Sequence, residues 1–253
     1  MRYALIGVEG SHDQAFVGKV LKLLGCQSFD GNEANLDPFW INFVPSYPKQ
    51  GNLYKRLDMP SILFTESVSV AIYSGEGSKL VRNLKANFAN YPEYRTDIAA
   101  FGIVADADRK SPEQVALDYY NGFSNLFPGF PDRAGVVDTG SPRTGIYLLP
   151  DNVSQGVLDT LLCNCGEVAY PMYVERANSY LAQFSSEERK SLKWKPFDRE
   201  KALIATIVSV LKPGKTNTVS LADNNWVSES TNMQVPTLAS FVDFLRELLE
   251  LHE

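Results

Sequence analysis

Two aspartates, Asp106 and Asp108, follow an apolar run that is typical of an inner strand. The run covers residues 101–105 and reads Phe-Gly-Ile-Val-Ala, which suits a parallel strand that is covered on both faces. Carboxylates at the end of such a strand need water, a partner or a cation, because an unpaired charge is costly to bury. Mg²⁺ and Mn²⁺ prefer oxygen ligands of this kind. A helix cap with a solvated turn explains an isolated Asp-x-Asp pair equally well, so this motif alone does not establish a metal site.

The elements that would position these aspartates are strands that alternate with helices. Apolar and alternating runs predict strands at residues 3–8, 67–75, 101–105 and 144–150, and apolar residues at helical spacing follow them. Strands that alternate with helices predict an α/β fold with a mostly parallel sheet flanked by helices. Ser11 and Ser111 have the spacing of capping residues for the helices that begin there.

The rest of the chain is expected to complete a single unit over residues 1–253. Residues 26–66 form an insertion with Pro, Gly and Asn between aromatic residues, and they either hold a short hairpin or cover a cleft. Residues 167–253 are expected to be mainly helical, with helices at 167–184 and 199–212. The last helix has one apolar face, which we expect to dock on the core.

Acidic residues follow several of the predicted strands. Glu9 and Asp13 come after the first strand, and Asp151 and Asp159 come after the fourth. In a sheet of parallel strands, sites form at the edge where the carboxyl ends meet. Acids from three strand ends, including the Asp-x-Asp pair, are therefore expected to converge there and to hold Mg²⁺ or Mn²⁺.

Composition and charge argue against several other classes of protein. A net charge of −6 over 253 residues disfavours a generally basic nucleic-acid binder, but it is compatible with an enzyme that binds cations and phosphates. The first residues carry only a short apolar run and predict neither a signal peptide nor a membrane span. The odd set of Cys26, Cys163 and Cys165 indicates reduced thiols and a cytoplasmic protein. Because His12 and His252 are the only histidines, zinc and Ser-His-Asp sites are disfavoured.

The acidic motifs together carry a resemblance to a known fold family. Glu9-Gly10-x-x-Asp13 after one strand, with Asp106-x-Asp108 after a later one, resembles the TOPRIM domain of topoisomerases, bacterial primases and overcoming-lysogenization-defect nucleases. The stretch GIYLLPDNVSQGVLDTLL, and also GEGSKL and LKPG, resemble a bacterial family of uncharacterised TOPRIM-like proteins, the DUF3226 group. The resemblance spans most of the chain, and it covers residues 26–66 least. It implies a TOPRIM-like, Rossmann-like sheet with additional C-terminal helices.

In TOPRIM nucleases, the resemblance implies cleavage of a nucleic-acid phosphodiester with Mg²⁺ or Mn²⁺ as cofactor. It implies that Asp106 and Asp108 ligate the metal, and that Glu9 is either a ligand or the general acid–base. Asp13 and Asp159 are candidates for a second metal. This chain departs from the family pattern at Asp159, where Glu is usual. The shorter side chain puts direct coordination in doubt, although it still allows coordination through water.

Basic residues supply the other expected contacts. Lys79 or Arg109 would neutralise charge on the phosphate in the transition state, and a solvated helix end is the alternative for both. Residues 189–215 contain eight Lys or Arg against two acids, with aromatic residues between them. This composition favours a nucleic-acid contact surface, with a locally basic helix face and a core Trp as the alternative. The candidate contact residues are Lys190, Lys193, Trp194 and Lys195.

Other interpretations stay open at this point. A buried strand that ends in Asp-x-Asp also resembles haloacid-dehalogenase phosphatases, but those carry the pair on the first strand, usually followed by Thr. A nucleotide-sugar transferase is a weaker rival. A different class is a nucleic-acid-binding or regulatory module that has kept the fold and lost turnover. TOPRIM nucleases often work with an ATPase. This chain has no G-x-x-x-x-G-K-[ST] loop, so any ATPase would be a separate chain, by analogy with modules of phage defence or DNA repair.

Overall fold

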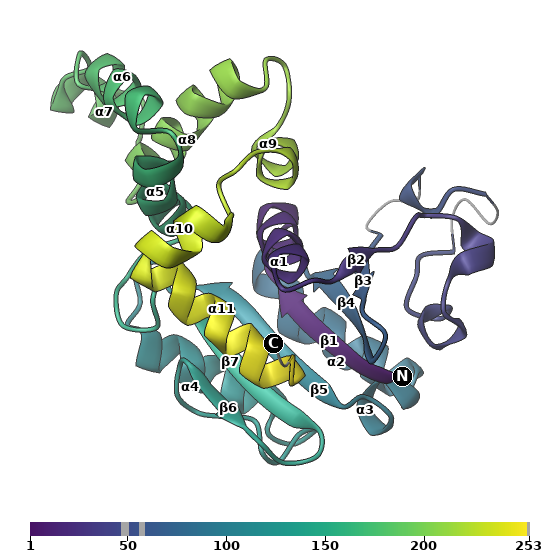
Figure 1. Cartoon of the computed structure of the whole chain (residues 1–253). Coiled ribbons are helices and arrows are strands. Elements are labelled where there is room, and N and C mark those ends of the chain that lie inside the picture. The colour runs from purple at the N-terminus through teal and green to yellow at the C-terminus, as the bar shows by residue number, and fades with distance from the viewer. Residues whose placement is uncertain (47–50, 56–58, 252–253) are drawn as a thin grey trace.

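Seven strands form one sheet in the computed structural model, which describes residues 1–46, 51–55 and 59–251. The sheet order is β2-β3-β4-β1-β5-β7-β6 (Figure 1). The strands are β1 (Arg2–Val8), β2 (Gln27–Ser28), β3 (Ser61–Phe64), β4 (Val68–Ser74), β5 (Ala100–Asp106), β6 (Val136–Asp138) and β7 (Arg143–Leu149). The central strands β4, β1, β5 and β7 are parallel, and antiparallel pairing adds β3 and β2 at one edge and β6 at the other. The predicted α/β fold with a mostly parallel sheet is confirmed.

Helices cover both faces of the sheet and divide the core into two clusters. On one face lie α1 (Ser11–Leu23), α5 (Leu158–Ala169) and α11 (Pro236–Leu249). The other face is covered by α2 (Leu80–Asn90), α3 (Glu93–Thr96) and α4 (Pro112–Phe123). Along β5, Phe101 and Ile103 point into the second cluster and Val104 into the first. Burial on both sides is the reason that this strand is apolar throughout.

The last helix packs closely on the sheet, as its apolar face predicts. A Cβ atom at Gly102 would lie 2.5 Å from Leu248 Cδ2, and one at Gly145 would lie 3.0 Å from Phe244 Cε2. These two glycines are register partners in β5 and β7. The missing side chains therefore create the groove that α11 occupies.

Local spacing predicts the N-cap residue of α4 correctly, but not that of α1. Ser111 Oγ accepts a hydrogen bond from Gln114 N at the start of α4, as expected. At α1 the N-cap is Gly10, whose N–H donates to Asp13 Oδ2 at 2.8 Å. The expected partner Gln14 instead reaches across to donate to the carbonyls of Met59 and Ile72. The negative charge of an aspartate in the first turn also interacts favourably with the positive end of the helix dipole.

The segment at 26–66 wraps one end of the sheet. Its 3-10 turns are η1 (Glu33–Asn35), η2 (Pro38–Trp40) and η3 (Leu53–Lys55). β2 and β3 pair, but a long connection separates them, so they do not form a short hairpin. Trp40 is fully buried and donates to Ser69 Oγ of β4 at 2.9 Å. Residues 47–50 and 56–58 of this segment lie outside the described chain.

The C-terminal helices extend from the carboxyl end of the sheet and then return to it (Figure 1). The remaining helices are η4 (Gly77–Lys79), α6 (Pro171–Leu181), α7 (Ser186–Ser191), α8 (Asp198–Leu211), α9 (Asn217–Asp223) and α10 (Glu229–Gln234). The helical pattern expected at 167–184 corresponds to α6, but its first residues, 167–169, belong to α5, because Pro171 cannot continue that helix. Trp226 is fully buried beside Tyr170 and donates to Ser220 Oγ at 3.0 Å, which ties α5, α6 and α9 together. None of the helices in the described ranges has the length and apolar character needed to span a bilayer.

Candidate functional site

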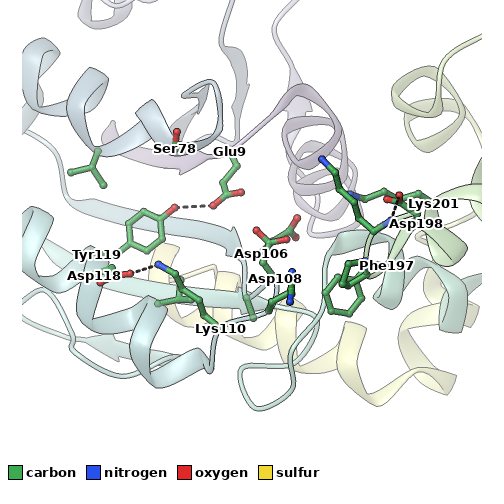
Figure 2. A pocket seen from close by; sticks show the side chains of 16 residues that line it. Glu9, Ser78, Asp106, Asp108, Lys110, Asp118, Tyr119, Phe197, Asp198 and Lys201 are labelled. Atoms are coloured by element: carbon green, nitrogen blue, oxygen red, sulfur yellow. Dashed lines mark hydrogen bonds and ion pairs between the residues drawn. The ribbon is translucent and has the colours of Figure 1, made fainter. Parts of the chain in front are cut away.

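A cavity of about 640 Å³ opens at the carboxyl ends of β1 and β5, where the acidic motifs lie. Glu9 follows β1, and Asp106 and Asp108 lie at the end of β5, and all three line the cavity (Figure 2). Residues 195–198 and Lys201, at the start of α8, line it from the opposite side. The cavity therefore joins the sheet edge to the C-terminal helices.

Tyr119 of α4 holds Glu9 in place. Its hydroxyl donates a hydrogen bond to Glu9 Oε1 at 3.0 Å (Figure 2). Burial raises the pKa of Glu9, the hydrogen bond opposes that rise, and the charge of Asp108 adds to it. The pKa of Tyr119 is itself raised, because the ring is buried and faces negative charge. Tyr119 is thus a donor that stays protonated.

Asp13 and Asp106 are the most strongly perturbed acids of the site. Asp13, in the first turn of α1, is 8% exposed. Burial, followed by the charge of Glu9, raises its pKa to about 7. Asp106 Oδ1 accepts a hydrogen bond from Leu158 N at 2.8 Å, at the start of α5. Burial, followed by the charges of Asp13 and Glu9, raises the pKa of Asp106 to about 8.

Asp108 and Asp159 are placed differently from each other. Asp108 adopts a left-handed backbone conformation, with φ of 53°, and exchanges two backbone hydrogen bonds with Gly156 at 2.8 and 3.1 Å. This bridge joins the β5 end to the loop before α5. Asp159, in the first turn of α5, is 5% exposed and does not line the cavity. Burial raises its pKa, and the charges of His12 and Lys201 oppose that rise.

The donor chemistry of this cluster fits a hard divalent cation. None of the five predicted metal ligands forms an ion pair with a Lys or Arg of the described residues. In the same part of the chain, no three of these side chains form a preassembled metal site. Tyr119, Gly10 and Leu158 each hold one carboxylate separately. Mg²⁺ commonly keeps several waters and uses one or two carboxylates, so separated acids are compatible with it.

Comparison with known proteins places the chain in a family. A family model described as a protein of unknown function, DUF3226, matches residues 3–250. The chain belongs to the DUF3226 family. The crystal structure of hypothetical protein PH0156 from Pyrococcus horikoshii OT3 is similar in fold, with a TM-score of 0.53, 16% identity and 99% of each chain covered. The chain matches none of the curated proteins with which it was compared.

The predicted basic residues of this DUF3226 protein are not all at the cavity. Arg109 and Lys195 line it. Lys79 lies outside the lining and pairs with Glu76 Oε2 at 2.7 Å on the exposed turn η4, while its neighbour Ser78 faces the cavity. Two predicted nucleic-acid contacts, Lys190 and Lys193, are exposed residues that do not line the cavity.

Trp194, another predicted nucleic-acid contact, is largely committed to the structure. It packs against the first core cluster, and the Arg189 guanidinium lies 5.5 Å from its ring centroid. Arg189 also donates to the Leu181 carbonyl at 2.6 Å. The structure therefore favours the alternative of a core Trp for this residue.

Sequence spacing did not identify several residues of the cavity. Tyr119 belongs to an ordinary amphipathic helix, and only the packing of α4 against the sheet brings it to Glu9. Phe197 and Lys201 come from a segment that is distant in sequence from both acidic motifs. His12 does not line the cavity, but its buried Nε2 has no hydrogen-bond partner among the described residues. Burial lowers the pKa of His12, the charge of Asp159 opposes that shift, and the charge of Lys201 adds to it.

Tyr119→Phe is expected to raise the pKa of Glu9 further, because the variant loses the hydrogen bond that the Tyr119 hydroxyl donates to the ionised carboxylate. The titration of the Glu9 carboxyl carbon by NMR, in buffer without divalent cations, measures this shift. Tyr120→Phe is the matched control, since Tyr120 is the neighbouring tyrosine and does not line the cavity. An unchanged Glu9 pKa would show that the hydrogen bond does not stabilise the ionised carboxylate.

Proposed function

We propose that this chain is a TOPRIM-like nuclease that cleaves nucleic-acid phosphodiesters with Mg²⁺ or Mn²⁺. The observation that carries the proposal is the group of carboxylates at one sheet edge, none of which forms an ion pair in the described residues. Glu9, Asp106 and Asp108 line the cavity, and Asp13 is buried behind it, close enough for Glu9 to act on its pKa. Holding such charges together costs free energy, and clusters of perturbed acids in a cavity are typical of functional sites. The Asp-x-Asp motif and Glu9 are the residues that support the TOPRIM comparison.

Asp106, Asp108 and Glu9 would hold the cation, and Asp13 is a candidate for a second one. A bound cation of this kind polarises a phosphoryl oxygen and lowers the pKa of water. Glu9 is the protein group best placed to accept or release a proton, because its pKa is raised and Tyr119 orients one of its oxygens. Arg109, which also lines the cavity, would stabilise charge on the phosphate.

The test is cleavage of plasmid, single-stranded DNA and tRNA by the purified protein, with Mg²⁺, with Mn²⁺ and with chelator. Cutting that depends on the cation supports the proposal. A calorimetric Mn²⁺ titration of the same sample accompanies the assay. No cutting together with no binding at millimolar Mn²⁺ would overturn the metal site and the nuclease function. Mn²⁺ binding without cutting would point either to a non-catalytic module or to a missing partner such as an ATPase. Adding a candidate ATPase chain to the assay distinguishes these two cases.

A further inference from the structure

One wall of the cavity comes from the segment that leads into α8. Lys195 and Lys201 line this wall, and Lys201 lies across the cavity from Glu9 (Figure 2). Neither ammonium group forms an ion pair within the described ranges of the chain. Lys201 nevertheless acts on the pKa of Asp159, so it lies near the acidic cluster. The wall carries these two lysines and one acid, Asp198, so it offers net positive charge to a ligand in the cavity.

Phe197 stands between these lysines without an evident structural partner. Its ring is half-buried and lines the cavity (Figure 2). Among the described residues, it packs with neither core cluster, whereas Trp194 packs with the first. An aromatic ring that lines a cavity and packs with no core cluster is available to stack on a ligand.

The backbone at Phe197 also departs from local preference. Its φ of 68° lies in the left-handed region, which bulky residues rarely adopt. It occupies the N-cap position of α8, where Ser, Thr, Asp and Asn are favoured. Asp198 Oδ2 accepts a hydrogen bond from Lys195 N at 2.7 Å and closes this turn. Strain of this kind gathers at binding and catalytic sites, and here it presents the ring to the cavity.

We infer that this wall binds single-stranded nucleic acid, with Lys195 and Lys201 on its phosphates and Phe197 stacked on an unpaired base. The inference rests on the proposed function, because it names the substrate class of the same cavity. A base inside a duplex is already paired and stacked, so it cannot cover a ring recessed in a cavity, whereas an unpaired base can. A volume of about 640 Å³ is within the range of small-ligand sites and suits a nucleotide. In this inference Phe197 takes the stacking role that the sequence suggested for Trp194, and Lys201 contacts phosphate together with Lys195.

Fluorescence anisotropy tests this inference without depending on cleavage. The probes are labelled oligodeoxyuridylate, oligouridylate and a duplex of the same length, all phosphorothioate-linked, in buffer with Mg²⁺. We expect single strands to bind about tenfold more tightly than the duplex, and Phe197→Leu to weaken their binding about tenfold. Phe197→Tyr keeps the ring and is expected to bind like wild type. A preference between the two single strands identifies the sugar, and either preference supports the inference.

The lysines have a matched control in the same segment. Lys195→Gln and Lys201→Gln should each reduce the salt dependence of binding by about one counterion. Lys190→Gln and Lys193→Gln remove the same charge outside the cavity and should change affinity by less than about twofold. Circular dichroism melts confirm that each variant folds.

Three results would overturn the inference: no binding of single strands, equal binding of the duplex, or unchanged binding by Phe197→Leu. Failure of the proposed function gives a different pattern. If single strands bind and the variants behave as expected, but the wild type cuts nothing with Mg²⁺ or Mn²⁺, the binding wall stands and the nuclease proposal fails. If the wild type cuts and Phe197→Leu binds and cuts like it, the nuclease stands and the binding wall fails.

Discussion

Glu9→Gln is expected to lower the rate of cation-dependent cleavage at least ~100-fold while the protein keeps its fold. The reason is that removal of a group that stabilises or transfers charge in the transition state lowers the rate by a factor on the order of 10²–10³. The amide retains the size of the side chain, and its oxygen can still accept the hydrogen bond from Tyr119 that the carboxylate accepts now at 3.0 Å. The change therefore removes the charge and the proton acceptor and leaves the packing intact.

The measurement compares initial rates of cleavage for wild type and Glu9→Gln at saturating Mn²⁺, with melting curves for both. Asp151→Asn is the matched control, since Asp151 also follows a parallel strand but accepts hydrogen bonds from Val153 N and Ser154 N in a turn and does not line the cavity. A rate for Glu9→Gln within about threefold of wild type would exclude Glu9 from the chemistry.

Asp106→Asn is expected to raise the melting temperature of the metal-free protein at pH 8. The pKa of Asp106 is raised from 3.8 to about 8 in the folded state. Between these two values the unfolded chain releases its proton first, so the folded state loses stability as pH rises from about 4 to about 8. Asn removes this cost, and its amide oxygen can keep the hydrogen bond from Leu158 N.

The size of this effect follows from the pKa shift. Each unit contributes about 1.4 kcal/mol, and each kcal/mol moves the midpoint of a chain of this length by about 2–4 °C. The rise of the pKa from 3.8 to about 8 corresponds to roughly 5 kcal/mol at pH 8. We therefore expect a rise on the order of 10–20 °C at pH 8 in chelator and a much smaller one near pH 4. Added Mn²⁺ should stabilise wild type and not the variant, because the cation compensates the charge that Asn lacks.

Melting curves at the two pH values, with chelator and with Mn²⁺, measure these expected changes in melting temperature. Asp151→Asn again serves as control, and its effect should have the opposite sign. Partial burial of Asp151 opposes ionisation, but hydrogen bonds from Ser154 and Val153 lower its pKa overall. A variant Asp106→Asn that melts at or below wild type at pH 8 would show that the carboxylates are not a source of instability.

Local pattern was enough to predict the acidic half of the site. Glu9 and the Asp-x-Asp pair each follow an apolar strand directly, and parallel strands bring their carboxyl ends to one edge. The strands β1 and β5 are neighbours in the sheet, so Glu9, Asp106 and Asp108 share one cavity. Asp151 shows the limit of the same logic: it also follows a parallel strand, yet its own turn captures its carboxylate.

The other half of the site could not be predicted in this way. Lys190 and Lys201 have the same residue type within one basic segment, and composition does not distinguish them. Only the position of α8 against the sheet edge puts Lys201 at the cavity and leaves Lys190 exposed. Similarly, Trp194 and Phe197 are both aromatic, and the packing of Trp194 on the core decides which ring remains available.

The sequence by itself determined the α/β alternation, the central parallel strands and the acids at their ends, because each depends on periodicity or on adjacency along the chain. The tertiary structure decided the antiparallel edge strands, the contact of Tyr119 with Glu9 and the wall built by residues 195–201. These features join segments that are far apart in sequence. Their placement follows from how whole helices pack, and no local spacing encodes it.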